Sequence, residues 1–478
     1  MSRRIIGPFS RVEGHLEIEL ERNETTVLEA RVNSPMYRGM ESVMLNRAPL
    51  DALIIAPRIC GICSVSQSVA AAKALAKLGN ISMPVNGELS TNLILGCEVL
   101  SNHLTHFYLF FMPDFARDIY HDKKWFKDAL RFKAEKGPAQ GEALKARTEL
   151  LHIMGVLAGK WPHTLTIRPG GTTQNIKTVE KLKLKTILRR FRTFLEDTVF
   201  GTPLEDILSL KSIQDVQHWQ KNNTGDLAAF LRFSQELDLN SIGKTNSTLL
   251  SGGGFDVRGT SLFKQGIYDA NGLGALPVDQ ISEDISHSFM AGPTSQHPFN
   301  AINDPFLDKE DAYSWCKAPR LHEESCEVGA LARHVVAGHD LFVEFYQHNS
   351  STVENRIFAR VWEMALLVSH MEHWINQITP DDKFFESCAF PENGRAVAFA
   401  EAARGTLGHW IELEKGVISN YQIIAPTTWN FSPRDKAGKA GPLERALENT
   451  PILKGEDDPV NVQHIVRSFD PCMACTVH

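Results

Sequence analysis

The chain lacks long apolar runs. No stretch of about 18 or more apolar residues occurs in it, which is the shortest length that reliably indicates a membrane-spanning helix. The N-terminus also lacks the apolar core of a secretory signal. We therefore expect no membrane span and a cytoplasmic protein, although a partner carrying an export signal would change the location.

Cysteine is scarce, with 8 in 478 residues, which excludes a disulfide scaffold. Excess positive charge is absent too, since the net charge is −7, and this argues against a nucleic-acid-binding surface. The basic stretch at residues 177–192 has apolar residues at helical spacing. It predicts a solvated helix face, with docking of another protein as the alternative. Residues 252–254 are three glycines without the Lys-Ser/Thr ending of a phosphate loop, and predict a turn.

Periodicity predicts mostly helices. Residues 15–21 and 27–32 alternate apolar and polar side chains and predict a hairpin. Helical patterns cover residues 64–78, 93–111, 227–239 and 353–378. Residues 115–146 are charged and are expected to form a peripheral segment outside the core. We expect a mainly α fold with small peripheral β-sheets (α+β), forming a single domain over residues 1–478.

Four cysteines stand in two Cys-x-x-Cys pairs, Cys60 with Cys63 and Cys472 with Cys475. Together they offer four thiolates, enough for a soft transition metal. Zinc ribbons place their pairs roughly 15–20 residues apart, whereas nearly the whole chain separates these. The fold must therefore bring them together, and a structural disulfide or zinc site is the alternative. The remaining cysteines are solitary and are expected to be buried small residues: Cys97, Cys316, Cys326 and Cys388.

The residues around the two pairs resemble the signatures of the nickel–iron hydrogenase large subunit. Arg-x-Cys-Gly-x-Cys stands at residues 58–63 and Asp-Pro-Cys-x-x-Cys-x-x-His at residues 470–478. Five further blocks follow the family's order, at residues 11–15, 37–41, 313–320, 403–410 and 426–430. The resemblance covers essentially the whole chain and implies the hydrogenase large-subunit fold.

The resemblance also implies a nickel ion bound by Cys60, Cys63, Cys472 and Cys475. Cys63 and Cys475 would bridge to an iron carrying one carbonyl (CO) and two cyanide (CN) ligands. Dihydrogen is apolar and a very weak acid, so a metal must polarise it while a nearby base accepts the proton. The family pattern makes the thiolate of Cys472 that base.

Further roles follow from the same resemblance. Glu13 would take the proton from Cys472 and pass it towards water; a helix cap or a surface carboxylate is the alternative. Arg404 would place a fixed positive charge over the open metal position, and its alternative is a structural salt bridge with Asp470. Thr427 is expected to hydrogen-bond a cyanide ligand.

Glu41 and His478 resemble the ligands of a second, magnesium-like site. A carboxylate suits a hard cation, whereas a histidine nitrogen is a less usual magnesium ligand. The resemblance also implies maturation proteins, which insert the metals and in many relatives remove an extension that follows this histidine.

The chain departs from the family pattern near the cysteines. Gln67 stands where a histidine is expected and loses the protonatable ring, and Asn102 removes a carboxylate close to Arg404. Ile62 and Phe110 align with the inner end of the family's gas tunnel, where many relatives have smaller residues. With Gln67 they resemble the regulatory, hydrogen-sensing branch, in which slow turnover and oxygen tolerance are expected; ordinary core packing is the alternative.

Three hypotheses compete. The first is a hydrogen sensor that passes electrons to an iron–sulfur small subunit and its signal to a histidine kinase. No cysteine set remains in this chain for an iron–sulfur cluster, so a partner is needed. The second is an energy-conserving uptake hydrogenase. The third is a hydrogenase-derived scaffold, like the related respiratory quinone-site subunits, and the four retained cysteines count against it.

Overall fold

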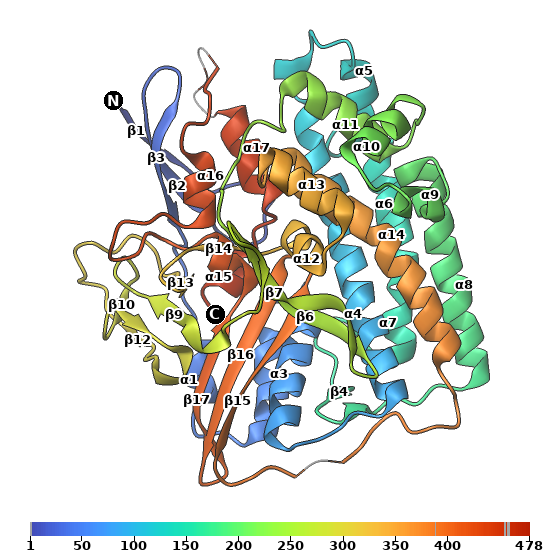
Figure 1. Ribbon diagram of the computed structural model, residues 1–478, viewed down its shortest axis with the longest axis vertical. Coiled ribbons are helices and arrows are strands. Elements are labelled where there is room, and N and C mark those ends of the chain that lie inside the picture. The colour runs from blue at the N-terminus through green and yellow to red at the C-terminus, as the bar shows by residue number, and fades with distance from the viewer. Residues whose placement is uncertain (1, 388, 454–455, 457–458) are drawn as a thin grey trace.

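A layer of long helices packs against a group of small sheets (Figure 1). The computed structural model describes residues 2–387, 389–453, 456 and 459–478, so Cys388 lies outside the described part. The α-helices are α1 (Met40–Met44), α2 (Ala52–Ile55), α3 (Ser64–Leu78), α4 (Val85–Thr105), α5 (Phe126–Ala129), α6 (Pro138–Leu150), α7 (His152–Leu157), α8 (Thr178–Phe194), α9 (Leu204–Leu208), α10 (Ile213–Lys221), α11 (Asp226–Leu237), α12 (Ala330–Ala337), α13 (Asp340–Asn349), α14 (Val353–Gln377), α15 (Pro426–Asn430), α16 (Pro442–Leu447), α17 (Val460–Ser468) and α18 (Met473–Thr476).

The predicted helices are confirmed, with one shifted start. Helix α3 has the predicted bounds, and α11 and α14 agree within two residues. Helix α4 begins at Val85, earlier than predicted, and continues through a π-helical turn (His106–Phe111) that ends before Pro113, as expected. The helix starts directly after its N-cap Pro84, whose ring fixes φ at −60° and whose ψ of 150° lies outside the helical region.

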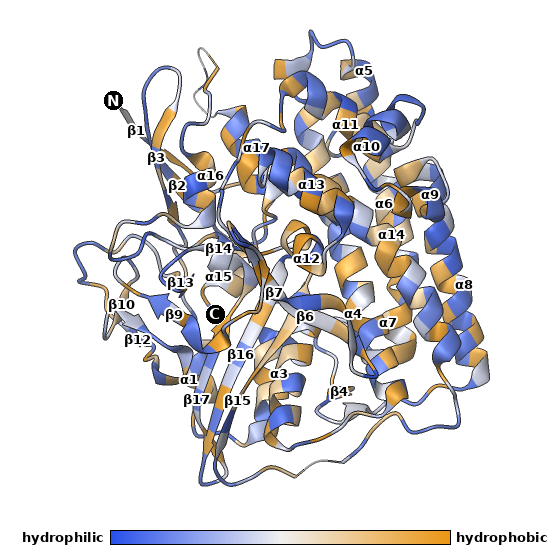
Figure 2. Cartoon of the chain, viewed as in Figure 1, coloured by the Kyte–Doolittle hydropathy of each residue, from blue (hydrophilic) through white to orange (hydrophobic). Residues whose placement is uncertain are grey.

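Apolar side chains explain the packing of this layer. Helix α4 is buried almost throughout, whereas α8 buries only Leu184, Ile187, Leu188 and Phe191. Figure 2 accordingly shows α8 largely hydrophilic at the edge of the layer, and the basic stretch is a solvated helix face, as predicted. One buried cluster draws on side chains from Ile6 to Cys475. The single domain over residues 1–478 stays a prediction, which this shared core supports.

Three sheets carry most of the strand structure. They are β1 (Ser2–Ile6), β2 (Glu17–Arg22) and β3 (Val27–Asn33); β15 (Gly394–Ala402), β16 (Gly405–Glu414) and β17 (Val417–Ile424); and β14 (Cys326–Glu327), β6 (Thr248–Val257), β7 (Thr260–Asp269) and β8 (Gly272–Gly274). Short strands form the rest: β4 (Ile167–Arg168), β5 (Gly171–Thr172), β9 (Ile281–Asp284), β10 (Met290–Ala291), β11 (Ser295–Gln296), β12 (Asp304–Pro305) and β13 (Ala318–Leu321). The predicted hairpin is β2–β3, paired antiparallel. The α+β class is confirmed, although β6 and β16 are largely buried rather than peripheral.

Two local expectations were wrong. The three glycines at residues 252–254 lie inside β6 rather than in a turn. A Cβ at Gly252 would lie 2.6 Å from Thr406 Cγ2 and 2.7 Å from Phe399 Cβ, so glycine lets β6 approach β15 and β16 closely. The segment at residues 115–146 is not wholly peripheral, because Phe115, Trp125 and Phe132 are buried. These rings pack with the aromatic side chains of α11, and the centroids of Trp125 and Phe233 are 4.5 Å apart.

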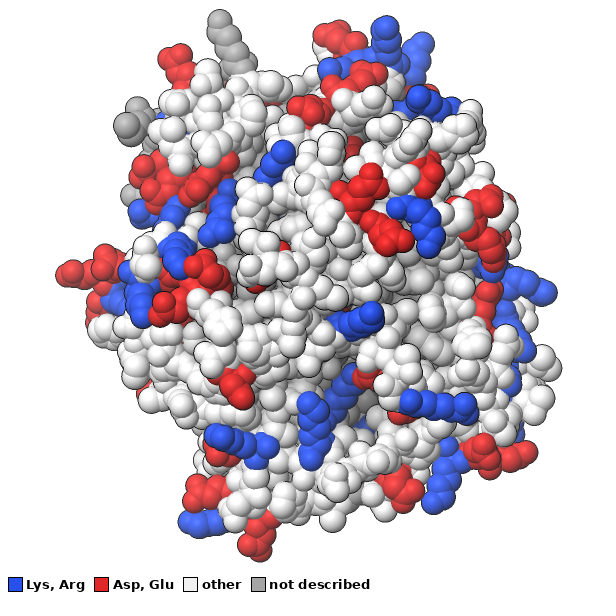
Figure 3. Space-filling model, viewed as in Figure 1, with Lys and Arg blue, Asp and Glu red and all other residues white. Residues whose placement is uncertain are grey.

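Two further features concern the helices and the surface. No helix in the described part of the chain has the length and apolar character to cross a membrane. Acidic and basic side chains are interspersed over the face in Figure 3 rather than separated by sign. The C-terminal residue His478 is buried, and this end of the chain lies inside the outline of the molecule in Figure 1. Cys97, Cys316 and Cys326 are buried free thiols, as predicted.

Candidate metal centre

The fold brings the two cysteine pairs together. Cys60 and Cys63 lie just before α3, while Cys472 precedes α18 and Cys475 lies within it. The Sγ atoms of Cys60 and Cys472 are 3.4 Å apart, those of Cys63 and Cys475 2.8 Å, and those of Cys472 and Cys475 3.3 Å. All four sulfurs lie within 4.8 Å of one another. Four sulfurs around one ion at metal–sulfur distances of about 2.3 Å need this spacing.

A backbone contact and an arginine side chain hold the cysteine segments in place. Glu13 pairs with Cys472 as a short parallel bridge, and the amide of Met473 donates to the Glu13 carbonyl at 2.9 Å. Arg38 Nη2 donates to the carbonyls of Ile59 at 2.6 Å and Ala474 at 2.5 Å. One guanidinium therefore links the segment before the first cysteine pair to helix α18, which carries Cys475.

The electrostatics of the four sulfurs favour a cation. Hydrogen bonds from the other three cysteines lower the pKa of Cys60, while burial raises the pKa of Cys472 well above its usual range. Four buried thiols this close cannot all ionise without a compensating positive charge. A bound metal ion supplies that charge and deprotonates its thiol ligands. The donor set thus fits a thiolate-bound transition metal.

Glu13 touches the cluster directly. Its Oε2 lies 2.9 Å from Cys472 Sγ and accepts the Ala474 amide at 3.3 Å. Because Ala474 is in the first turn of α18, Glu13 also caps this short helix, so one carboxylate fits both sequence-based interpretations. The residue is half-buried, and it therefore lies between the buried sulfurs and the surface.

Arg404 is held on one side and free on the other. Its Nε donates to the Asp470 carbonyl at 2.7 Å, and its Nη2 lies 3.0 Å from Asp470 Oδ1 and 3.3 Å from Asn102 Oδ1. Burial alone would raise the pKa of Asp470, but Arg404, together with other nearby basic side chains, lowers it. The predicted salt bridge is present. Among the residues that the structure describes, Arg404 Nη1 has no hydrogen-bond partner.

A small cavity adjoins Cys63 and Cys475. Its lining includes Gln67, Glu98, Asn102, Arg404, Leu407, Pro426 and Thr427. Within the described part of the chain, Asn102 Nδ2 is also a buried donor without a partner. Thr427 Oγ1 accepts the Cys472 amide at 3.2 Å. Buried unpaired donors are costly, and small acceptor ligands such as cyanide would satisfy them.

Gln67 is linked to an imidazole outside the cavity. Its Oε1 lies 2.8 Å from His409 Nε2, and His409 Nδ1 lies 2.7 Å from the Tyr421 hydroxyl. Burial lowers the pKa of His409 to about 3, so this ring is neutral. It donates through Nε2 to Gln67 and accepts from Tyr421.

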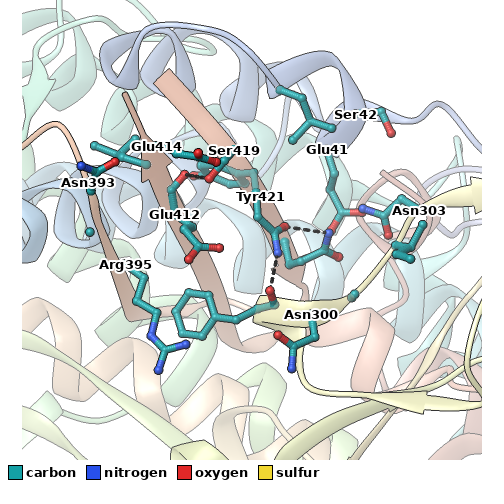
Figure 4. A pocket seen from close by; sticks show the side chains of 18 of the residues that line it. Glu41, Ser42, Asn300, Asn303, Asn393, Arg395, Glu412, Glu414, Ser419 and Tyr421 are labelled. Atoms are coloured by element: carbon teal, nitrogen blue, oxygen red, sulfur yellow. Dashed lines mark hydrogen bonds between the residues drawn. The ribbon is translucent and has the colours of Figure 1, made fainter. Parts of the chain in front are cut away.

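Glu41 and His478 meet at a second site. Glu41 Oε1 lies 3.2 Å from His478 Nε2 and accepts the Ile423 amide at 2.7 Å, while Lys317 Nζ is 3.8 Å from Glu41 Oε2. Burial would raise the pKa of Glu41, but Lys317 and His478 together lower it. Glu41 also lines a cleft of about 660 Å³ together with Asn303 and Gln422 (Figure 4). Lys317 Nζ donates to the amide oxygens of Asn303 and Gln422 at 3.3 and 3.0 Å. Glu41 and His478 are therefore the groups here that could hold a hard cation.

The two expected gas-channel residues lie outside the cavity lining. Ile62 is half-buried between the first two cysteines and packs against the core. Phe110 is half-buried in the π-helical turn, and its carbonyl accepts Arg11 Nη1 at 3.0 Å. Their role stays a prediction.

Three residues of the site region were not predicted. Arg38 and Lys317 lie inside matching blocks, but their contacts depend on distant partners. Glu98 lines the cavity from α4. The sequence could have pointed to it, because Glu98 is the single carboxylate within the apolar residues 93–100.

Comparisons with known proteins identify related hydrogenases. A family model described as nickel-dependent hydrogenase matches residues 38–129 and 141–478. The chain is 29% identical to the periplasmic NiFeSe hydrogenase large subunit of Desulfomicrobium baculatum, over 99% of this chain and 94% of that protein. It is 27% identical to the hydrogenase-1 large chain of Escherichia coli (strain K12), over 100% and 95% of the two chains. The reduced Ni-Fe-Se hydrogenase of D. vulgaris Hildenborough superposes with a TM-score of 0.86 at 28% identity, with 100% of both chains covered.

Proposed function

The chain belongs to the nickel-dependent hydrogenase family, as a hydrogenase large subunit, and we propose that it cleaves dihydrogen heterolytically with Cys472 and Glu13 carrying the proton. The observation that supports this most is the contact of 2.9 Å between Glu13 Oε2 and Cys472 Sγ, beside four mutually close sulfurs. A nickel–iron centre, when bound, supplies the Lewis acid that polarises dihydrogen. Cys60, Cys63, Cys472 and Cys475 would hold it.

The chain's own residues then move the proton. The Cys472 sulfur accepts it as a base next to the reacting molecule, and Glu13 Oε2 is within hydrogen-bond reach for the next transfer. Glu13 is half-buried, whereas the sulfurs are almost fully enclosed. The carboxyl can therefore pass the proton from the enclosed site towards solvent.

Arg404 would place its positive charge over the open metal position, and Thr427 would hydrogen-bond a cyanide ligand of the iron, which carries one carbonyl and two cyanides. Asp470 anchors the guanidinium through Nε and Nη2, which leaves Nη1 without a partner among the described residues. This arrangement supports a fixed positive charge over the open metal position. Thr427 reaches the cavity from α15.

A magnesium-like cation at Glu41 and His478 is part of the proposal. His478 is also tied to the centre, because its Nδ1 lies 2.8 Å from the carbonyl of Cys475. A cation bound there would fix the C-terminal residue and, through it, the last cysteine. Maturation proteins would load both sites.

Electrons must leave through a partner. Outside the four site cysteines, the free cysteines of the described residues are the scattered Cys97, Cys316 and Cys326, so no iron–sulfur cluster can form from them. We expect an iron–sulfur small subunit to carry the electrons.

We further propose that the protein senses hydrogen in the cytoplasm and passes its signal to a histidine kinase. Gln67, Ile62 and Phe110 support it, as departures that resemble the regulatory branch. The competing function is energy-conserving hydrogen uptake, which the name of a relative, the uptake hydrogenase large subunit of Rhizobium leguminosarum bv. viciae (25% identical), favours. Hydrogen-dependent change in the phosphorylation of a co-purifying kinase would distinguish the two, and rapid turnover without such a change would favour uptake.

The function is tested on the protein purified with its small subunit. We expect stoichiometric nickel and iron, infrared bands of carbonyl and cyanide ligands, and hydrogen–deuterium exchange catalysed by the same sample. Protein that folds and binds the small subunit but holds no nickel or shows no such bands would overturn the assignment of this centre.

The gas-path residues give a separate prediction. The double variant Ile62→Val and Phe110→Leu removes bulk from two half-buried positions, and the freed space would be only partly refilled. Because oxygen is larger than hydrogen, widening a constriction admits relatively more oxygen. We expect near-native hydrogen oxidation before exposure to air and loss of most of it afterwards. The control is Ile213→Val with Phe126→Leu, two half-buried core contacts remote from the cysteines in sequence; equal survival of all three proteins would argue for ordinary packing.

A further inference from the structure

Glu98 is a buried carboxylate that receives hydrogen bonds from four donors. Its side chain leaves α4 and is only 2% exposed. Oε1 accepts the Ser66 amide at 2.9 Å and the Ser66 hydroxyl at 2.8 Å. Oε2 accepts the Val65 amide at 2.8 Å and Trp161 Nε1 at 3.2 Å. Both oxygens are thus fully engaged as acceptors, which suits the ionised form.

The two amides belong to the first turn of α3, whose N-cap residue is Cys63. An N-cap side chain normally accepts a hydrogen bond from the second or third amide of its helix. Cys63 makes no such bond, and its sulfur instead lies 2.8 Å from Cys475 Sγ. Glu98 takes both amides, Val65 as the second and Ser66 as the third. It therefore caps α3 from another helix, in place of the residue at the cap position.

We propose that Glu98 is a positioning residue that keeps the amides of α3 away from the Cys63 sulfur, so that this thiolate donates fully to the metals. The inference rests on the proposed nickel–iron function. Hydrogen bonds to a ligating sulfur withdraw electron density and tune the metal. A thiolate at a helix N-terminus is the natural acceptor for the first-turn amides and for the helix dipole. With Glu98 in place, its carboxylate accepts the first-turn amides and faces the helix dipole instead.

This role differs from that of Glu13. Glu13 presents an oxygen to Cys472 and is half-buried, as a proton acceptor should be. Glu98 has no oxygen left for a sulfur or a substrate, because backbone, hydroxyl and indole donors occupy both. Burial raises the pKa of Glu98 to about 7, and the two backbone amides oppose part of that rise. Measurements are therefore made at alkaline pH, where the carboxyl is ionised.

The test compares Glu98→Gln with Glu444→Gln in the purified complex. Glu444 is a matched control, since it is fully buried on α16 and accepts the Val32 amide at 3.0 Å and the Tyr313 hydroxyl at 2.8 Å. In Glu98→Gln the new side chain keeps one acceptor oxygen. Its NH₂ group cannot accept a hydrogen bond, so one of the two first-turn amides of α3 becomes free to turn towards Cys63. We expect faster hydrogen exchange at the amides of Val65 and Ser66. We also expect the carbonyl and cyanide bands to shift to higher frequency, because a poorer sulfur donor leaves less density for back-donation.

Glu98→Asp distinguishes the effect of the negative charge from that of side-chain length. It also replaces the glutamine variant in the test if that variant does not fold. It keeps the negative charge but is one methylene shorter, so it cannot hold both amides, and a smaller shift in the same direction is expected. Faster exchange at Val65 and Ser66 with unmoved bands would overturn the proposal and leave Glu98 as a helix cap only. An equal shift in Glu444→Gln would overturn it too. Absence of the bands from the native complex would instead refute the proposed function.

Discussion

Replacing Cys475 with serine is expected to abolish nickel binding and hydrogen-dependent activity together. The Cys475 sulfur lies 2.8 Å from Cys63 Sγ and 3.3 Å from Cys472 Sγ, so it links the two halves of the donor set. A neutral hydroxyl is a poor ligand for a soft metal. Activity should fall to background, and metal analysis should find little nickel in otherwise folded protein.

The matched control is Cys326→Ser. Cys326 is also a buried free thiol, 1% exposed, but it lies in β14, and its sulfur is 4.0 Å from the carbonyl of Glu324 rather than among other sulfurs. This variant carries the same chemical change and should keep its nickel and most of its activity. A Cys475→Ser protein with full activity and stoichiometric nickel would contradict the four-cysteine site.

Local patterns predicted the elements whose partners are near in sequence. The bounds of α3 followed from its composition and the Gly79 stop, and the β2–β3 hairpin followed from its alternation. The glycines of β6 were wrongly predicted to form a turn. Gly252 is needed because Phe399 on β15 and Thr406 on β16, far along the chain, approach it closely. Single-sequence patterns contain no information about such a partner.

The candidate site divides in the same way. Spacing and flanking residues predicted that the cysteines act together, and the short distances among their sulfurs agree. Resemblance named Glu13 and Arg404, and both contact the expected neighbours. The hydrogen bonds of Arg38 to two backbone carbonyls and the capping of α3 by Glu98 were not predicted. Each depends on backbone groups that only folding brings close to the side chain.

The geometry around Glu13 also explains why its conservative replacement is informative. The residue holds three contacts in addition to that with sulfur: its carbonyl accepts the Met473 amide, its amide donates to the Pro471 carbonyl, and its carboxylate accepts the Ala474 amide. A glutamine can keep all three, since its side chain retains an acceptor oxygen. The substitution therefore changes proton chemistry while preserving the segment that holds Cys472.

Glu13→Gln is expected to leave the centre assembled and to slow both turnover and hydrogen–deuterium exchange. Loss of a positioned acid–base group costs about 10²–10⁴-fold in rate, and here the group lies 2.9 Å from the sulfur that accepts the proton. The control is Glu17→Gln, a half-buried carboxylate on β2 that binds Asn33 Nδ2 at 3.0 Å instead of a sulfur. Nickel content and infrared bands should match the native protein in both variants, and only the first should lose exchange. Unchanged exchange in Glu13→Gln would mean that the proton leaves by another route, and Glu13 would then be only the cap of α18.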